Sequence, residues 1–89
     1  MTDVTPAMTI TVRYFAAARD AAGADSSVLH LKNGATIDDA IRELCGQSDK
    51  MILVLQKCSF LSDGVAVRDR GTVLRPHQTL DVLPPFAGG

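Results

Sequence analysis

The residues best suited to chemistry stand at the end of the sequence, which closes with Pro84, Pro85, Phe86, Ala87, Gly88 and Gly89. The two prolines fix their own φ angles, lack N–H donors and bias Leu83 toward an extended conformation. Gly88 and Gly89 carry no side chains, so the backbone here could pass through a channel that excludes other residues. The pattern predicts a stiff, extended tail (residues 84–89) that presents an unhindered carboxylate at Gly89.

A carboxylate must be activated before it reacts, because its negative charge opposes nucleophilic attack and its oxygen is a poor leaving group. ATP can convert such a group to an acyl-adenylate, which a sulfur or nitrogen nucleophile can then attack. On this interpretation Gly89 bears the carried group, and partner enzymes supply the catalysis.

The cysteines and histidines offer little other chemistry. Cys45 and Cys58 form no CxxC pair, and two cysteines cannot build a disulfide scaffold. His30 and His77 add two potential ligands, but no pair lies at the short spacings of structural zinc sites. Neither histidine has a serine or cysteine partner at a recognisable motif spacing. We therefore expect no metal site and no hydrolytic triad.

The composition is typical of a small globular domain. Of 89 residues, 46% are hydrophobic and 21% are charged, which is too apolar for a disordered chain. The net charge of −1 leaves no electrostatic footprint for nucleic acid. No apolar run approaches the ~18 residues of a membrane span, and the first residues do not resemble a signal peptide. We expect a cytoplasmic domain that binds neither nucleic acid nor membrane.

Hydropathy patterns predict a series of strands and helices between a disordered extension (residues 1–7) and the tail. They are a strand over 8–14, a helical turn over 16–22, a strand over 28–31, a helix over 37–45, an apolar run over 51–55, a hairpin over 60–67 and a strand over 79–83. The run 51–55 could be strand or helix, and we expect it to be buried on both sides.

The clearest helix lies between Thr36, a potential N-cap, and Gly46, a potential C-cap. Its apolar residues recur at the helical period and predict one stripe that faces a sheet: Ile37, Ala40, Ile41 and Leu44. This order of elements over residues 8–83 favours an α+β domain of the β-grasp type, a mixed sheet with one main helix on one face. Its first and last strands would lie side by side in the middle of the sheet, in parallel.

From Met8 to the end, the sequence resembles the MoaD-type sulfur carriers of the ThiS/MoaD ubiquitin-like family, the small subunits of molybdopterin synthase. Three segments carry the resemblance: the opening strand 10–16, the turn from Arg19 to Gly23, and the ending 81–89. The paired prolines favour this branch, because thiazole-pathway carriers share the fold and the Gly-Gly but usually lack the prolines. Asp20 departs from the family, which usually has glutamate there.

The resemblance implies a cycle in molybdenum cofactor biosynthesis. An E1-like adenylyltransferase would use ATP to adenylate the Gly89 carboxylate, and a sulfurtransferase would convert it to a thiocarboxylate. The carrier would then dock on the large subunit of molybdopterin synthase, in a heterotetramer, and donate sulfur to cyclic pyranopterin monophosphate to form the dithiolene. The chain would bind no cofactor and would be the non-catalytic, sulfur-donating subunit.

The resemblance also implies partner-docking residues: Phe15, Leu83, Val65 and Ala66, with Arg19 as a candidate contact to the activating enzyme. The sequence supports Phe15 and Leu83 independently, because both depart from the inward face of their strands and would form an exposed apolar patch. Alternatively, both cap a second small core under residues 16–22. Arg19 could equally be a solvated helix residue.

Three other functions remain open for the same residues. A carrier for thiazole, cysteine or another product would differ only in the sulfur acceptor. A ubiquitin-like tag would be conjugated through Gly89 to protein lysines. A plain β-grasp interaction module would keep its full function without Gly89.

Overall fold

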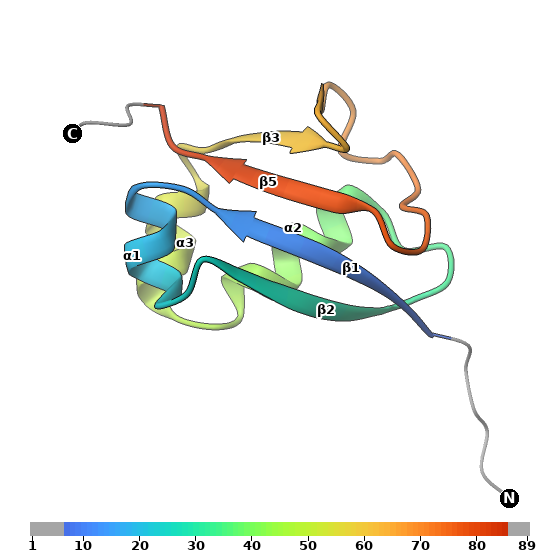
Figure 1. The fold of residues 1–89 in the computed structure, drawn as a ribbon, viewed down its shortest axis with the longest axis horizontal. Helices are drawn as coiled ribbons and strands as arrows, with labels where there is room; N and C mark the ends of the chain where they lie inside the picture. The colour runs from blue at the N-terminus through green and yellow to red at the C-terminus, as the bar shows by residue number, and fades with distance from the viewer. Residues whose placement is uncertain (1–6, 86–89) are drawn as a thin grey trace, which may run out of the picture.

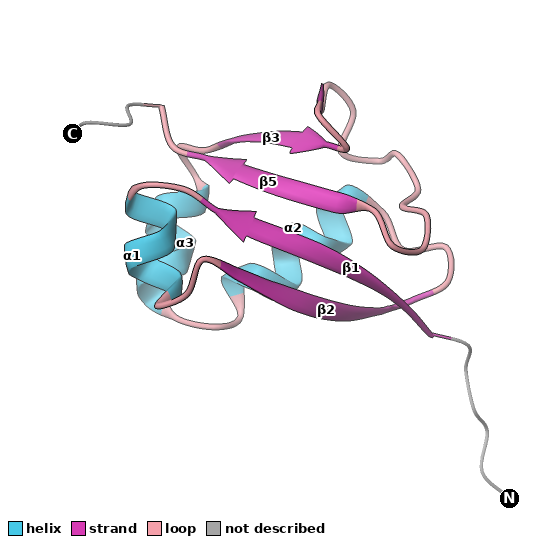
Figure 2. Cartoon of the chain, viewed as in Figure 1, coloured by secondary structure: helices cyan, strands magenta, loops and turns pink. Residues whose placement is uncertain are grey.

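Residues 7–85 fold into one mixed sheet with three short helices (Figures 1 and 2). The structure, a computed structural model, describes residues 7–85. Its elements are β1 (Ala7–Tyr14), α1 (Ala17–Ala22), β2 (Ser26–Lys32), α2 (Ile37–Cys45), α3 (Asp49–Leu55), β3 (Ser59–Ser62), β4 (Val65–Ala66) and β5 (Thr79–Leu83). Figure 1 shows α2 crossing behind the sheet, and α1 and α3 together at the end where β1 and β5 finish.

The strand order is β2-β1-β5-β3-β4, so the two ends of the domain meet in the middle of the sheet. β1 and β5 are parallel, and the pairs β1–β2, β3–β5 and β3–β4 are antiparallel. This topology, with α2 packed on one face, is the β-grasp fold. The expected fold class and the central parallel pair are both confirmed.

The core lies between the sheet and the helices and follows the predicted periods. Every second residue of β1 is buried: Met8, Ile10, Val12 and Tyr14. Leu80 and Val82 of β5 are buried beside them, and α2 contributes the predicted apolar stripe. Because side chains alternate along a strand, the intervening residues lie on the opposite sheet face. We call this opposite side the outer face.

The helix α2 begins as predicted and is held by a capping box. The Thr36 hydroxyl accepts from the Asp39 N–H at 3.2 Å, and the Asp39 carboxylate accepts from the Thr36 N–H at 2.9 Å. These bonds satisfy backbone donors that would otherwise lack partners at the first turn.

Replacing Thr36 with alanine is expected to lower the free energy of unfolding by about 1 kcal/mol. The Thr36→Ser variant keeps a hydroxyl acceptor and should unfold close to the wild type. Urea denaturation followed by circular dichroism would measure both, and equal midpoints for alanine and wild type would contradict the prediction.

The same capping box makes stability depend on pH. Hydrogen bonds from the Thr36 backbone N–H hold the pKa of Asp39 below its ordinary value of 3.8. The bonds therefore stabilise the fold above that ordinary value, and their contribution is lost as pH falls through the lower pKa of the folded state. The Asp39→Asn variant retains an acceptor that does not titrate. Its stability relative to the wild type should therefore rise as acid is added, and parallel pH profiles of unfolding would count against this.

The apolar run 51–55 is buried on one side only, so the expectation of burial on both sides is wrong. The run belongs to the helix α3, which Ser48 caps by accepting from the Met51 N–H. Met51 and Leu55 are buried, whereas Leu53 is 65% exposed. A helix turns only one stripe toward its neighbours, so a continuous apolar run must leave some members in solvent.

Strand boundaries also shift slightly from those expected. β1 begins at Ala7, one residue before the predicted start, because Ala7 pairs with Lys32 of β2. β2 runs from Ser26 to Lys32 because it pairs with β1 along its whole length. Asp63 and Gly64 connect β3 to β4 with positive φ angles of 47° and 83°, as a tight hairpin requires.

Candidate functional site

The tail leaves the sheet from β5, a strand paired on both sides. β5 pairs with β1 from Thr79 to Val82 and with β3 as far as Leu83, which lies opposite Ser59. Pro84 is half-buried and Pro85 is exposed. The other predicted tail residues, Phe86, Ala87, Gly88 and Gly89, lie outside the described residues. The base of the tail is therefore anchored in an interior strand of the sheet.

Phe15 and Leu83 lie level with each other where the central strands end. Tyr14 pairs with Val82, and the Phe15 N–H donates to the Val82 carbonyl at 3.3 Å. Since Val82 faces the core, alternation places Leu83 on the outer face. Phe15 follows the end of β1, and its ring lies beside Arg13 of the same face. Phe15 is 38% exposed and Leu83 is half-buried, and neither belongs to the hydrophobic core cluster. An apolar pair therefore borders the point where the tail begins.

A continuous row of residues crosses all five strands beside this pair. In strand order it consists of Ser26, Arg13, Asp81, Leu61 and Ala66, each opposite the next. Arg13 binds the Asp81 carboxylate with two bonds, Nε to Oδ1 at 2.6 Å and Nη2 to Oδ2 at 2.8 Å. The hydrogen bonds and charge of Asp81 raise the pKa of Arg13 above its ordinary value. The two residues are 68 positions apart, and no local sequence pattern predicts this ion pair.

The other predicted docking residues are distributed over different surfaces. Ala66 belongs to the row on the outer face, opposite Leu61. Val65 is exposed and lies opposite Ser62, which itself pairs with Leu80 of the core. By alternation, Val65 lies on the other side of the sheet.

Arg19 lies on α1, with its guanidinium 3.6 Å from the Asp25 carboxylate. Its side chain remains largely solvated, and so does that of Asp25. Arg19 is therefore available to a partner that approaches α1, which begins two residues after Phe15.

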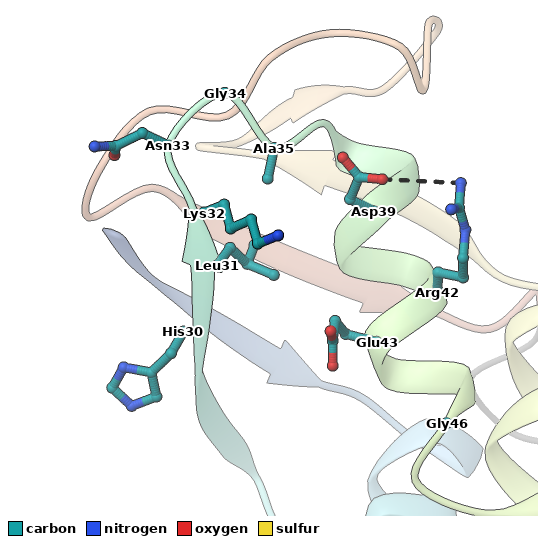
Figure 3. A pocket seen from close by; sticks show the side chains of 10 residues that line it. All are labelled: His30, Leu31, Lys32, Asn33, Gly34, Ala35, Asp39, Arg42, Glu43 and Gly46. Atoms are coloured by element: carbon teal, nitrogen blue, oxygen red, sulfur yellow. Dashed lines mark ion pairs between the residues drawn. The ribbon is translucent and has the colours of Figure 1, made fainter. Parts of the chain in front are cut away.

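A groove of about 620 Å³ lies at the opposite end of the strands, between the edge strand β2 and α2 (Figure 3). Figure 3 shows Asp39 and Arg42 paired on α2, whereas His30 points away from the helix. On the sheet side, the groove is lined by the end of β2, which pairs with the beginning of β1. The groove is therefore remote from the tail and supplies no reactive group to it.

Other reactive side chains are sparse among residues 7–85. Within this range no cluster of three or more histidine, cysteine, aspartate or glutamate side chains could hold a metal ion. Cys45 and Cys58 are free and half-buried, and burial raises the pKa of the Cys58 thiol. No helix of the described residues is long and apolar enough to cross a membrane.

A mixed sheet in the order β2-β1-β5-β3-β4, with a central parallel pair and α2 on one face, places the domain among ubiquitin-like β-grasp proteins. The sequence matches the ThiS family over residues 12–89, and the chain belongs to this family of sulfur carriers.

Named relatives lie within the same class. The chain is 28% identical over 83 residues to a molybdopterin synthase sulfur carrier subunit from Chlamydomonas reinhardtii, covering 92% of this chain and 100% of the relative. Among solved structures, molybdopterin converting factor subunit 1 from Pyrococcus furiosus superposes with a TM-score of 0.81 at 24% identity, covering 89% of this chain and 99% of that chain. Small archaeal modifier protein SAMP1 from Haloferax volcanii superposes with a TM-score of 0.79 at 22% identity, covering 91% and 99%.

A further solved structure holds two different subunits. It is the complex of subunits 1 and 2 of the molybdopterin-converting factor from Helicobacter pylori, with a TM-score of 0.65 at 18% identity, covering 92% of this chain and 100% of the matched one. At these identities the solved structures show the shared fold.

Proposed function

We propose that this protein is a sulfur carrier of molybdenum cofactor biosynthesis, the small sulfur-donating subunit of a molybdopterin synthase. One observation carries the proposal: the ending Pro-Pro-Phe-Ala-Gly-Gly follows directly from β5, a strand in the interior of the sheet. Membership of the ThiS family and the likeness to an algal molybdopterin synthase sulfur carrier subunit support it.

The proposed cycle begins with activation of Gly89 in the cytoplasm. On an E1-like adenylyltransferase, a carboxylate oxygen attacks the α-phosphorus of ATP, and pyrophosphate leaves. The terminal sulfur of a sulfurtransferase persulfide then attacks the acyl carbon and expels AMP, which leaves an acyl disulfide. A second thiol breaks the S–S bond, releasing the thiocarboxylate and a disulfide. ATP is thus a substrate of the activating enzyme, and the carrier binds no cofactor of its own.

The sulfur is then used on the large subunit. We propose that the apolar pair Phe15 and Leu83 docks there, with Ala66 at the far side of the outer face, while residues 84–89 extend into the partner's active site. The thiocarboxylate sulfur attacks a carbon of cyclic pyranopterin monophosphate and displaces an oxygen substituent from it. Water then hydrolyses the acyl–sulfur bond, which leaves the sulfur on the substrate and returns Gly89 to a carboxylate. A dithiolene has two sulfurs, so two carriers are used for each product, which suits a heterotetramer with two small subunits. Val65 and Arg19, on other surfaces, are proposed as peripheral contacts, Arg19 toward the activating enzyme.

The test is the intact mass of the protein after incubation with ATP, the E1-like enzyme and a sulfur donor. We expect replacement of one oxygen by sulfur, and no change when ATP is omitted. The charged protein should then form dithiolene when mixed with a large subunit and cyclic pyranopterin monophosphate. Sulfur loading without dithiolene would reject the molybdopterin pathway and retain the carrier class, whereas an unchanged mass would reject both.

A protein modifier is the second candidate, because the chain shares its fold with SAMP1. In this function a lysine amine, rather than sulfur, attacks the Gly89 acyl-adenylate. Expression of a tagged chain in its own host would then produce a ladder of larger species on denaturing gels. A single band at the mass of the free chain would favour the sulfur carrier.

A further inference from the structure

The outer face has a charged centre that is bordered by apolar residues on the side toward β4. Arg13 and Asp81 occupy the central strands, and their neighbours in the row toward β4 are the apolar Leu61 and Ala66. We propose that this ion pair determines which partner the outer face accepts, by presenting Arg13 to an uncharged carbonyl oxygen of the large subunit. The inference rests on the proposed docking of the outer face and adds the chemistry that the partner must offer.

Asp81 fixes the direction in which Arg13 can donate. Its two oxygens engage Nε and Nη2, so the Nη1 group and one further N–H of the guanidinium are directed elsewhere. Only 7% of the Asp81 side chain is exposed, whereas 53% of the Arg13 side chain is exposed. The guanidinium carbon also lies 5.6 Å from the centre of the Phe15 ring. Arg13 is thus a preorganised donor beside the apolar pair, and Asp81 is its positioning residue.

The charge of the pair specifies the acceptor. A partner that covers the outer face removes water from the free N–H groups of Arg13, which then need new acceptors. Asp81 already neutralises the guanidinium, and it would repel a second carboxylate brought into the same dry interface. A main-chain or amide carbonyl meets the requirement without added charge. The partner surface is therefore apolar with a carbonyl oxygen over Arg13.

A role in stabilising the fold explains the Arg13–Asp81 pair less well than a role in partner specificity. An ion pair with one partner half exposed to solvent adds little to the free energy of unfolding, because water and salt screen its charges. β1 and β5 also have a full parallel ladder and buried side chains to hold them together. Specificity, in contrast, is gained from a polar group that an incorrect partner leaves unpaired.

The experiment is calorimetric titration of the large subunit with the wild type and with a double variant, Arg13→Met with Asp81→Leu. The double variant removes both charges while retaining much of the apolar volume. We expect its affinity to fall by about tenfold to a hundredfold, because the partner carbonyl loses its donor. Wild-type affinity should change little between low and high salt.

Further variants distinguish the ion pair from the rest of the outer face, and the charge of Arg13 from its geometry. Thr11→Val removes a polar group from the outer face of β1 without touching the pair, and it should bind like the wild type. Arg13→Lys keeps the charge but not the planar fork, so its binding should be weakened too. Sulfur loading by the E1-like enzyme should be normal in a double variant that is folded.

Two outcomes would overturn the inference: equal binding of the double variant and wild type, or an equal loss in Thr11→Val. A steep salt dependence that disappears in the double variant would overturn the uncharged acceptor and indicate a carboxylate. If the wild type itself does not bind the large subunit, the proposed function fails, and that result is distinct from the others.

Discussion

A chain that lacks Gly89 is expected to form about 100-fold less thiocarboxylate, or none, while its unfolding curve is unchanged. Removing one residue shortens the reach of an extended tail by ~3.5 Å, so the new carboxylate stops short of the adenylation site. The fold should not change, because β5 ends at Leu83 and the buried core within residues 7–85 does not extend past Val82. Intact mass after sulfur loading measures the first quantity, and urea denaturation measures the second.

Substitutions in the tail provide the control for this deletion. Gly89→Ala retains the length of the tail but adds a Cβ, so it should also be loaded poorly if the channel of the activating enzyme admits only glycine. Ala87→Ser alters the tail outside the Gly-Gly pair and should be loaded normally. Normal loading of the chain without Gly89 would refute the need for a tail of this length, whereas an unchanged mass for both chains would favour a β-grasp interaction module.

The fold was largely predictable because its signals are local. The alternation from Met8 to Tyr14 arises from one buried face, and Thr36 and Gly46 mark the ends of α2 through hydrogen bonds within a few residues of each other. The hairpin at Asp63 and Gly64 is equally local. The segment 51–55 was ambiguous because a short, continuous apolar run has no period that separates helix from strand.

The candidate site was predictable only where it depends on one stretch of sequence. The tail is such a stretch, and its prolines and glycines have consequences that need no partner strand. The ion pair is different, because Arg13 and Asp81 are 68 positions apart and meet through the β1–β5 register. Both residues occupy outward positions of strands that the sequence predicted to be adjacent. Without the register, their bidentate contact could not be inferred.

The register also explains why the predicted docking residues separate. Ala66 and Val65 are neighbours in sequence, but successive residues of a strand face opposite sides of a sheet. Only Ala66 shares the outer face with the row that contains Asp81. A strand of two residues is too short for its sequence pattern to reveal which of them faces outward.

The Phe15→Ala variant is expected to bind the large subunit at least about 30-fold more weakly while it is loaded with sulfur normally. Phe15 is an exposed aromatic side chain level with Leu83 at the base of the tail, the position in which a buried interface anchor would be most effective. Because the ring lies outside the core cluster, the variant should remain folded.

A matched control distinguishes this anchor effect from a general loss of apolar surface. Val73→Ala also shortens an exposed apolar residue, but Val73 pairs with Thr36 at the start of α2, away from the tail. Calorimetric titration should therefore show wild-type affinity for Val73→Ala and a marked loss for Phe15→Ala. Similar affinities for all three proteins would mean that the large subunit uses another surface. If Phe15→Ala lost sulfur loading and binding together, its ring would serve the activating enzyme as well, because both partners must reach the same tail.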